Sequence, residues 1–335
     1  MQASLENPIY TTYVVAGGNK YNITPAVTEL DFSDPKNEIA QRVTIGIMNA
    51  KVKGGRLSDL LGVRNRVYIH ANDGSKNDEV FRGYFWTYGD RTANDGRDLT
   101  LICYDNLIYF QESEESVYFS SGKSTDSVCS TLCGNWGVKL AYNYETITHS
   151  KMALRGYLSD IFMADVLDLV KERTGKKYVI RSIKDVMHID GVGQNTTVYR
   201  FKSAGNSVDF RRECTMNGMV TKVVILGKAD DSDRQPVEAT VSGNTSEYGT
   251  LQKLIDRDKN TSLADAKKEA NSIIKEKGEP KWEYELKTAD VPWVRKGDKV
   301  HIDIEGAMSG YLIVIDVSRS ISNKSKTMTL TMEKP

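Results

Sequence analysis

Residues 296–333 read KGDKVHIDIEGAMSGYLIVIDVSRSISNKSKTMTLTME, and residues 64–105 read RNRVYIHANDGSKNDEVFRGYFWTYGDRTANDGRDLTLICYD. Each passage contains three short runs of alternating apolar and polar residues, separated by Gly, Asn, Asp or Ser. This is the pattern of three strands joined by turns. Because the runs follow in the same order and at similar spacing, the two passages predict one small β unit that occurs twice in the chain.

The correspondence rests on three pairs of segments: 64–69 with 297–302, 83–85 with 310–312, and 99–101 with 328–330. Short β segments also resemble one another by chance, so their order and spacing carry more weight than the letters. On that basis we expect an internal duplication of a small β domain.

The composition is that of a folded globular protein. The chain has 335 residues, of which 39% are hydrophobic and 27% are charged, and it is long enough for two or three domains. Lys+Arg and Asp+Glu both number 45, which gives a net charge of zero. Proteins that bind nucleic acids usually carry a basic excess, so specific nucleic-acid binding is not expected.

The sequence shows no targeting or disulfide pattern. Its first residues lack the basic and apolar regions of a signal peptide, and no run approaches 18 apolar residues. We therefore expect neither secretion by ordinary routes nor direct membrane insertion. The four cysteines are scattered, which favours reduced thiols over a disulfide framework: Cys103, Cys129, Cys133 and Cys214.

Residues 1–107 predict an N-terminal β-barrel domain. Asn72-Asp73-Gly74 and Asn94-Asp95-Gly96 each lie between two strand patterns, which is a strong hairpin signal. Several short strands with turns at this spacing are typical of a small barrel or a sandwich.

Residues 108–200 predict a mixed α/β domain. A short helix is expected after Ser124, and a longer one within residues 157–174, where Gly175 is well placed to end it. The run KYVIR at 177–181 then returns as a strand.

Residues 201–228 and 281–335 together predict a C-terminal β-barrel domain, interrupted by an insertion at 229–280 that consists of a polar loop and a helix. Residues 229–250 are rich in turn formers and poor in apolar residues, so we expect a loop or flap that is mobile in the isolated subunit.

The helix of the insertion is expected to begin at Thr261 or Ser262 and to end at Gly278. A Ser or Thr cap at the start, a Gly at the end and Pro280 just beyond are the usual boundary signals of a helix.

The sequence offers no complete catalytic or metal-binding set. Cys129 and Cys133 lie four residues apart on a predicted helix, but this spacing is not a usual zinc half-site, and both fit its apolar face. No H-E-x-x-H, G-x-S-x-G or Walker A motif is present. The histidines have no neighbour at ligand spacing: His70, His149, His188 and His301.

A glycosidase requires two facing carboxyl groups. The acidic candidates are Glu112, Glu114, Glu115, Asp256 and Asp258. Both runs are polar and turn-like, which favours solvated surface over a buried acid with a raised pKa. We therefore expect no catalytic, cofactor-binding or metal-binding residues and no cofactor.

An aromatic cluster lies in one predicted strand. Regular alternation places Tyr84, Trp86 and Tyr88 on one face and Phe85 on the other. The face with three aromatic residues fits a core, a subunit interface or a glycan platform, of which a core or an interface is the default.

Five segments together have a recognisable layout: DEVFRGYF (78–85), ADVLDLVKERTGKKYVIR (164–181), MNGMVTKVVILGK (216–228), SLADAKKEANSIIKEKG (262–278) and the closing passage 296–333. With these segments the chain resembles the baseplate hub proteins of contractile phage tails and phage-tail-like particles, in particular the PBSX-type prophage hub proteins of Gram-positive bacteria. The resemblance covers most of the chain and is one of overall layout, and none of its segments identifies an active-site atom.

The resemblance implies an α+β, mainly β fold in which two similar tail-tube-like β-barrel domains are joined by a smaller mixed α/β region with helices. It implies a non-enzymatic homotrimer, a pseudo-sixfold ring of six like modules that joins the tail tube to the central spike. Implied partners are the tail tube protein, the central spike protein, the tape-measure protein and other baseplate proteins.

The implied location is the baseplate of a virion or of a phage-tail-like particle, such as a tail-like bacteriocin, assembled in the bacterial cytoplasm. The alternative function is a peptidoglycan hydrolase or a glycan-binding baseplate subunit. Two facing carboxyl groups in a cleft would favour the hydrolase.

Overall fold

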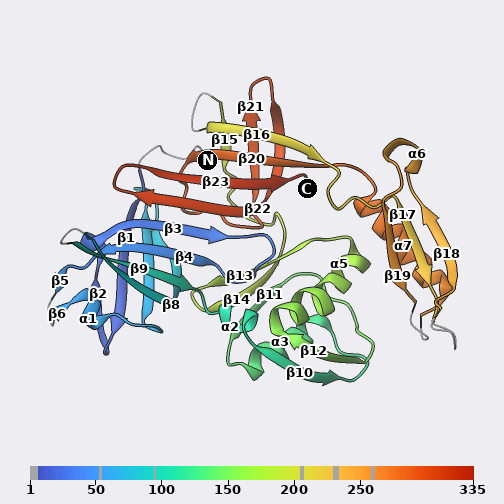
Figure 1. Cartoon of the computed structure of the whole chain (residues 1–335), viewed down its shortest axis with the longest axis horizontal. Helices are drawn as coiled ribbons and strands as arrows, with labels where there is room; N and C mark the ends of the chain where they lie inside the picture. Colours follow the sequence, from blue (N-terminus) through green and yellow to red (C-terminus); the bar gives the residue numbers. More distant parts are fainter. Residues whose placement is uncertain (1–6, 53–54, 94–95, 204–206, 229–233, 258–260) are drawn as a thin grey trace. The chain divides into compact units, whose positions relative to one another are not determined.

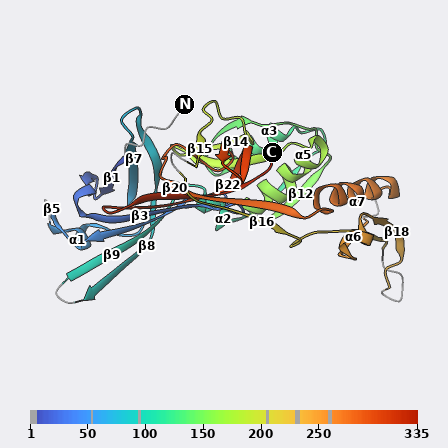
Figure 2. The same ribbon diagram turned by 90° about the horizontal axis from the view of Figure 1, so that it is seen from above.

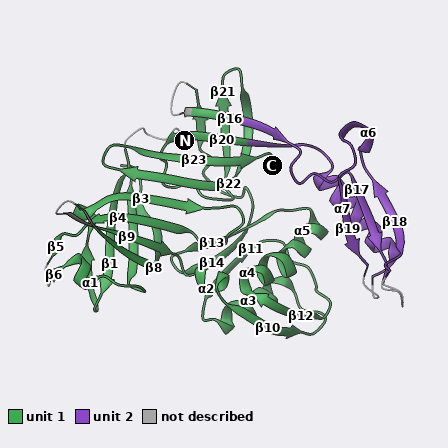
Figure 3. Ribbon diagram, viewed as in Figure 1, with its two compact units in different colours: residues 1–211, 284–335 green, residues 212–283 purple. Residues whose placement is uncertain are grey.

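The computed structural model describes residues 7–52, 55–93, 96–203, 207–228, 234–257 and 261–335. The chain divides into two compact units, of which unit 1 contains residues 1–211 and 284–335 and unit 2 contains residues 212–283 (Figure 3). The described residues are mainly β (Figure 1). No helix in these ranges is long and apolar enough to span a membrane.

The N-terminal part of unit 1 is built from strands, with one short α-helix and one 3₁₀ turn (Thr24–Ala26). In chain order these elements are β1 (Ile9–Ala16), β2 (Asn19–Asn22), β3 (Val27–Asp34), β4 (Arg42–Met48), β5 (Lys51–Val52), β6 (Gly55–Arg56), α1 (Leu57–Leu60), β7 (Arg66–Asn72), β8 (Asn77–Ala93) and β9 (Gly96–Tyr104).

The middle part of unit 1 mixes helices and strands, as the sequence predicts. Its elements are α2 (Ile108–Gln111), β10 (Glu114–Phe119), α3 (Thr125–Asn135), β11 (Lys139–Asn143), β12 (Met152–Tyr157), α4 (Leu158–Asp160), a π-helix (Ile161–Leu167), α5 (Asp168–Thr174), β13 (Tyr178–Ile183) and β14 (Val186–Gly191). The predicted long helix is therefore interrupted by a π-helical segment, and Gly175 ends it in the left-handed conformation.

The last part of unit 1 returns to strands: β15 (Arg200–Lys202), β16 (Ser207–Thr215), β20 (Lys281–Ala289), β21 (Lys299–Ile304), β22 (Met308–Ser322) and β23 (Lys326–Glu333). Residues 212–215 of β16 and 281–283 of β20 belong to unit 2. A single large sheet runs in the order β16-β20-β23-β22-β3-β4-β9-β8-β7-β1-β2, and β21 branches from β22 (Figure 1). Among the described strands this path is open and does not close into a barrel.

Three apolar cores support unit 1. One lies under β1–β9 and contains Phe32, Ile45 and Phe85. The second lies in the middle part and the third under β20–β23, where Leu286 and Leu330 are fully buried. Alternation along each strand sends one set of side chains into these cores and leaves the other set on the opposite face.

Strands β7, β8 and β9 pair in the same pattern as β21, β22 and β23. In each set, the first half of the long middle strand pairs with the strand before it, and the second half pairs with the strand after it. The register shifts at Trp86 in β8 and at Ile315 in β22. These matching bulges align residues 99–101 with 328–330, as the sequence comparison predicts.

One of the predicted correspondences is wrong by two residues. Val67 pairs with Gly83, whereas Val300 pairs with Leu312, so Gly83 corresponds to Leu312 and not to Gly310. The reason is that the hairpin between β7 and β8 contains more residues than the hairpin between β21 and β22.

The two predicted hairpin turns of the N-terminal part have different outcomes. The turn at Asn72–Gly74 is confirmed, because β7 and β8 pair up to Asn72 and Asn77, and Gly74 has a positive φ of 85°. Asn94 and Asp95 of the second turn lie outside the described residues. The strands β8 and β9 that flank them form a long antiparallel hairpin (Figure 2).

Unit 2 is a three-stranded sheet covered by a helix. It contains β17 (Lys222–Leu226), β18 (Val237–Ser242), α6 (Thr245–Tyr248), β19 (Gln252–Asp256) and α7 (Leu263–Lys277), with strand order β18-β17-β19. Its core joins Val223, Ile225 and Ile255 of the sheet to Ala266 and Ala270 of the helix. Ser262 caps α7 as predicted, through a bond from the Asp265 N–H.

The prediction of a polar loop at 229–250 is wrong for Val237–Ser242, which form β18 and pair with β17. Two small apolar residues of this strand, Ala239 and Val241, pack against the core of unit 2. Because polar residues flank and separate them, the strand pattern is hard to recognise in the sequence. Residues 229–233 lie outside the described residues, and the mobility of the segment remains a prediction, as do the predicted domain boundaries.

A glycine substitution tests the packing of β8. A Cβ atom at Gly83 would lie 2.2 Å from the Tyr104 carbonyl oxygen, whereas a Cβ atom at Gly89 would lie 3.8 Å from its nearest neighbour. We expect Gly83→Ala to lower the free energy of unfolding by about 1–3 kcal/mol through overpacking, and Gly89→Ala to be neutral or slightly stabilising. Thermal and urea unfolding of both variants would measure this, and equal effects would contradict it.

Candidate assembly surfaces

One face of the large sheet packs on the cores under β1–β9 and β20–β23, and on the second face Tyr104 packs against the core of the middle part. On this second face, side chains of neighbouring strands form rows, such as Thr329, Ser318 and Ser33, which lie directly opposite one another on β23, β22 and β3. We call this surface the hydroxyl face; its hydroxyl-bearing members are Ser33, Thr44, Thr87, Thr100, Ser318, Ser320, Thr327, Thr329 and Thr331.

The hydroxyl face carries charged residues of both signs. Glu29, Asp31, Asp98, Glu285 and Asp316 share it with the hydroxyl groups. The basic residues Arg42, Arg91 and Lys287 lie in the same rows, and Arg91 is directly opposite Asp98. Most of its members are therefore polar.

The strand edges of the sheet differ in their pairing. The outer edge of β22 pairs first with β21 and then, from Val317 to Ser322, with β3. The edge of β8 that faces away from β9 pairs with β7 along the first half of the strand. Beyond the bulge at Trp86, no described strand pairs with this edge. Strand β16 lies at the end of the sheet and has β20 as its neighbour.

The predicted aromatic face of β8 is corrected by the bulge at Trp86. Tyr84 and Trp86 form edge-to-face contacts with Tyr109, which packs against the core of the middle part and not against the core under β1–β9. Tyr88, in contrast, packs against the same core as Phe85. A bulge adds one residue to a strand and reverses the alternation after it, so Tyr88 returns to the side of Phe85.

The segment 290–298 connects all parts of unit 1. Asp290 accepts hydrogen bonds from Tyr10 of β1 and Arg319 of β22. Trp293 packs against both the core under β1–β9 and the core under β20–β23. Gly297 accepts a bond from the Gly193 N–H, and its tight packing on Val179 leaves no space for a side chain.

Lys296 is the central charged residue of this segment. Its side chain is 7% exposed, and its Nζ lies 2.8 Å from Asp34 Oδ1, 2.8 Å from the Pro35 carbonyl and 2.7 Å from the Glu38 carbonyl. On the other side, Asp298 accepts a 3.0 Å bond from Arg181 of β13. These bonds tie the last part of unit 1 to β3 and to the middle part.

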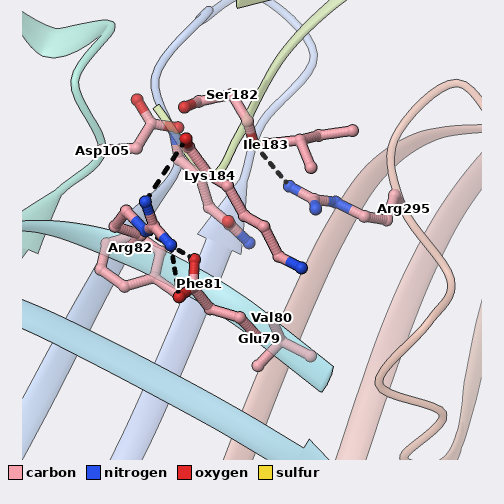
Figure 4. Close-up of a pocket in the computed structure, with 10 residues that line it drawn as sticks. Glu79, Val80, Phe81, Arg82, Asp105, Ser182, Ile183, Lys184 and Arg295 are labelled. Carbon is pink, nitrogen blue, oxygen red and sulfur yellow. Dashed lines mark hydrogen bonds and ion pairs between the residues drawn. The ribbon is translucent and has the colours of Figure 1, made fainter. Parts of the chain in front are cut away.

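A small polar cavity, about 10 Å³, lies beside this segment between Asp105, Ser182, Lys184, Arg82 and Arg295, as Figure 4 shows. It has room for one water molecule at most. The Lys184-Asp185 turn closes β13 and β14 with positive φ at both residues. Asp185 accepts bonds from Arg66 and Arg82 of the neighbouring sheet.

Asp105 is a buried carboxyl group of this cavity. It is buried, and its carboxyl accepts bonds from the backbone N–H groups of Gln41 and Leu107 at 3.0 and 2.9 Å. Burial raises the pKa of Asp105 to about 7, although the two N–H groups act in the opposite direction. Neither Asp105 nor Lys296 was a candidate from the sequence; the only signal was the dense charge of residues 295–298.

The structure places the cysteine candidates in a core. Cys129 and Cys133 are buried on α3 beside Val128 and Leu132. Burial raises the pKa of both thiols, that of Cys133 to about 12, so neither forms a reactive thiolate near neutral pH. They act as small apolar residues.

The histidine and acidic candidates are not brought together. His149 is buried against the Thr125 hydroxyl, and His301 contacts Tyr311. Glu112 and Glu114 are exposed, whereas Glu115 accepts a bond from Trp136. Asp256 is exposed on unit 2, and Asp258 lies outside the described residues. Within the described part of the chain, no group of three or more His, Cys, Asp or Glu could hold a metal ion.

The buried pair of Lys296 and Asp34 gives a stability prediction. We expect Lys296→Met to lower the free energy of unfolding by about 3–5 kcal/mol, because Asp34 then remains buried without its cation. Lys296→Met with Asp34→Asn should recover much of the loss. The exposed pair Lys176–Glu145 is the control, and Lys176→Met should cost less than about 1 kcal/mol. A double variant as unstable as the sum of both single variants would contradict the pairing.

Asp105 gives a pH prediction. Between pH ~4 and ~7 the folded chain keeps a proton on Asp105 that the unfolded chain has lost. The contribution of Asp105 to stability therefore falls as pH rises through this window, by at most about 1.4 kcal/mol per pH unit. The free energy of unfolding of the wild type minus that of Asp105→Asn should fall from pH 4 to 7 and then level off. A constant or rising difference would contradict the assignment.

Solved structures of phage tail proteins share this fold. The tail protein from Neisseria meningitidis MC58 is 12% identical, with a TM-score of 0.71 over 97% of this chain and 96% of that chain. The 43 kDa tail protein of prophage MuSo2 from Shewanella oneidensis is 11% identical, with a TM-score of 0.72 over 98% and 99%. Prophage tail protein gp18 from Listeria monocytogenes EGD-e is 11% identical, with a TM-score of 0.59 over 96% and 94%.

At these identities the likeness shows the fold alone. No curated protein matches the sequence. The YQBQ-like family model matches residues 59–333, from α1 to the last strand of the large sheet, and the chain therefore belongs to the YQBQ-like family.

Proposed function

We propose that the chain is a structural baseplate hub subunit of a phage tail or phage-tail-like particle. Three copies assemble into a pseudo-sixfold ring that joins the tail tube to the central spike. The observation that carries this proposal is the direct joint between β22 and β3, which connects two sets of strands with the same pairing pattern.

The two sets of strands act as two like modules within one chain. In the first set β4 pairs with β9, β9 with β8, and β8 with β7; in the second set β20, β23, β22 and β21 follow the same order. Two like modules in each of three copies give six positions around one axis. Such a ring matches a sixfold tube on one side and a threefold spike on the other.

The hydroxyl face is suited to the wall of the central channel. It carries hydroxyl groups and charges of both signs, so it lacks the basic excess that binds phosphate tightly. A genome or a tape-measure protein then slides past the wall without tight binding. This agrees with the net charge of zero and with the proposed absence of specific nucleic-acid binding.

The proposed partners are a second and third copy of the chain, the tail tube protein, the central spike protein, the tape-measure protein and other baseplate proteins. The three similar solved structures are all tail proteins and align over nearly their whole length, which supports this setting. A PBSX-type prophage origin and an assembly site in the bacterial cytoplasm belong to the same proposal.

We further propose that the chain has no catalytic role. The acidic candidates Glu112 and Glu114 are exposed, and Glu115 is bonded to Trp136. None of them lies in a buried site of the kind that a general acid occupies. The hydrolase alternative has no specific observation in its favour.

Deletion of the gene in the producing bacterium tests the proposed function. We expect assembled tails to disappear and to return with the wild-type gene, because the ring joins tube and spike. Quantitative mass spectrometry of purified tails should find three copies of the chain in each tail, which is half the number of tube subunits in one sixfold ring. Normal tails without the chain, or a different copy number, would contradict the hub.

A zymogram on purified cell walls separates the enzyme from the structural subunit. The purified chain should leave the wall intact. Lysis that a single carboxylate substitution abolishes would contradict the structural proposal.

A further inference from the structure

Two other strand edges in the chain correspond to the edges of β22 and β3 that pair in this joint, and they lie far apart in the sequence. Val317 to Ser322 of β22 pair with β3, with Ser318 opposite Ser33 and Ser320 opposite Asp31. The edges that correspond to this joint are the second half of β8 and the outer edge of β16. Neither edge pairs with a described strand.

The bulges fix the correspondence between β8 and β22. Phe85 and Cys103 pair just before the register shift in the first set, and Val314 and Met332 do so in the second set. Counting forward from the bulge, Gly89 takes the position of Ser318 and Arg91 takes the position of Ser320.

Two side-chain contacts, Phe210 with Tyr284 and Arg212 with Trp282, indicate the correspondence between β16 and β3. Phe32 of β3 lies opposite Val43 of β4, which in turn lies opposite Cys103. Tyr284 of β20 takes the position of Val43, because it lies opposite Met332. Phe210 of β16 stacks on Tyr284 with ring centroids 6.3 Å apart and so takes the position of Phe32. Arg211 then corresponds to Ser33 and Asp209 to Asp31.

We propose that β8 of one copy pairs antiparallel with β16 of a second copy, with Gly89 opposite Arg211 and Arg91 opposite Asp209. This inference rests on the proposed ring and assigns its copy-to-copy contact. It repeats between copies the joint that β22 and β3 make within one chain.

Charge favours this register. Arg91 and Asp209 are both exposed and carry opposite charges, and directly opposed charges of unlike sign stabilise a strand pair. A long strand edge without a neighbour is also a site of uncontrolled association. A heterologous contact that closes after three copies removes such edges from the ring.

Disulfide cross-linking of the full chain tests the register. Residues directly opposite in an antiparallel pair have Cα atoms about 4.5–5.5 Å apart, which suits a disulfide. In a Cys214→Ser background, Gly89→Cys with Arg211→Cys should give a covalent trimer after oxidation at high protein concentration. The matched control, Gly89→Cys with Asp209→Cys, shifts the register by two residues to about 7–8 Å and should cross-link poorly.

A charge exchange tests the same contact independently. Arg91→Asp in the Gly89→Cys/Arg211→Cys chain should lower the cross-linking yield by about two- to five-fold. Adding Asp209→Arg should restore it. Both residues are exposed, so the thermal midpoint of each variant serves as the control for folding.

The outcomes separate this inference from the proposed function. Equal yields for both cysteine pairs, or no cross-link with either, overturn the register. If purified tails still contain three copies of the chain, the proposed hub function stands even though the register is wrong. A covalent ladder beyond three copies supports the strand pairing but contradicts the three-copy ring.

Discussion

The arrangement of unit 1 depends on the buried ammonium group of Lys296. A charged group in a protein interior is stable only when nearby oxygen atoms replace its hydration shell. Here the Asp34 carboxylate and two carbonyl groups of residues 35–38 fill that role. Because these oxygens belong to the end of β3 and the loop after it, Lys296 holds the segment 290–298 against β3. The neighbouring bonds of Asp290 and Asp298 extend this hold to β1, β22 and the middle part.

This constraint explains how one sheet can contain both sets of strands. The β22–β3 joint needs two strands that are almost 300 residues apart to meet in register, with Val317 opposite Asp34. Loop closure over that length is entropically unfavourable, and the buried contacts of the 290–298 segment offset it. The result is a continuous sheet with a hydroxyl face. Its polar character follows from alternation, since every second residue of each strand leaves the core.

The sequence predicted local features of the fold well where the signal was short-range. The Asn-Asp-Gly turn after β7, the Ser262 cap of α7 and the Gly175 end of α5 all appear in the structure. It failed where one residue changes the phase of a pattern. The bulge at Trp86 sends Tyr88 back to the core, and no residue in the strand marks that bulge. Strand β18 was missed because its apolar residues are small and few.

The sequence by itself determined that the chain is mainly β, that a three-stranded pattern occurs twice, and that no complete catalytic motif is present. These conclusions depend on periodicity and turn chemistry, which neighbouring residues encode. Only the tertiary structure decided that β22 pairs with β3, that Lys296 and Asp105 are buried, and which described strand edges have no strand partner. Those features depend on contacts between residues that are distant in the sequence. The free energy of such a contact is set by burial and by the oxygen atoms that surround each charge. A linear sequence displays neither of these.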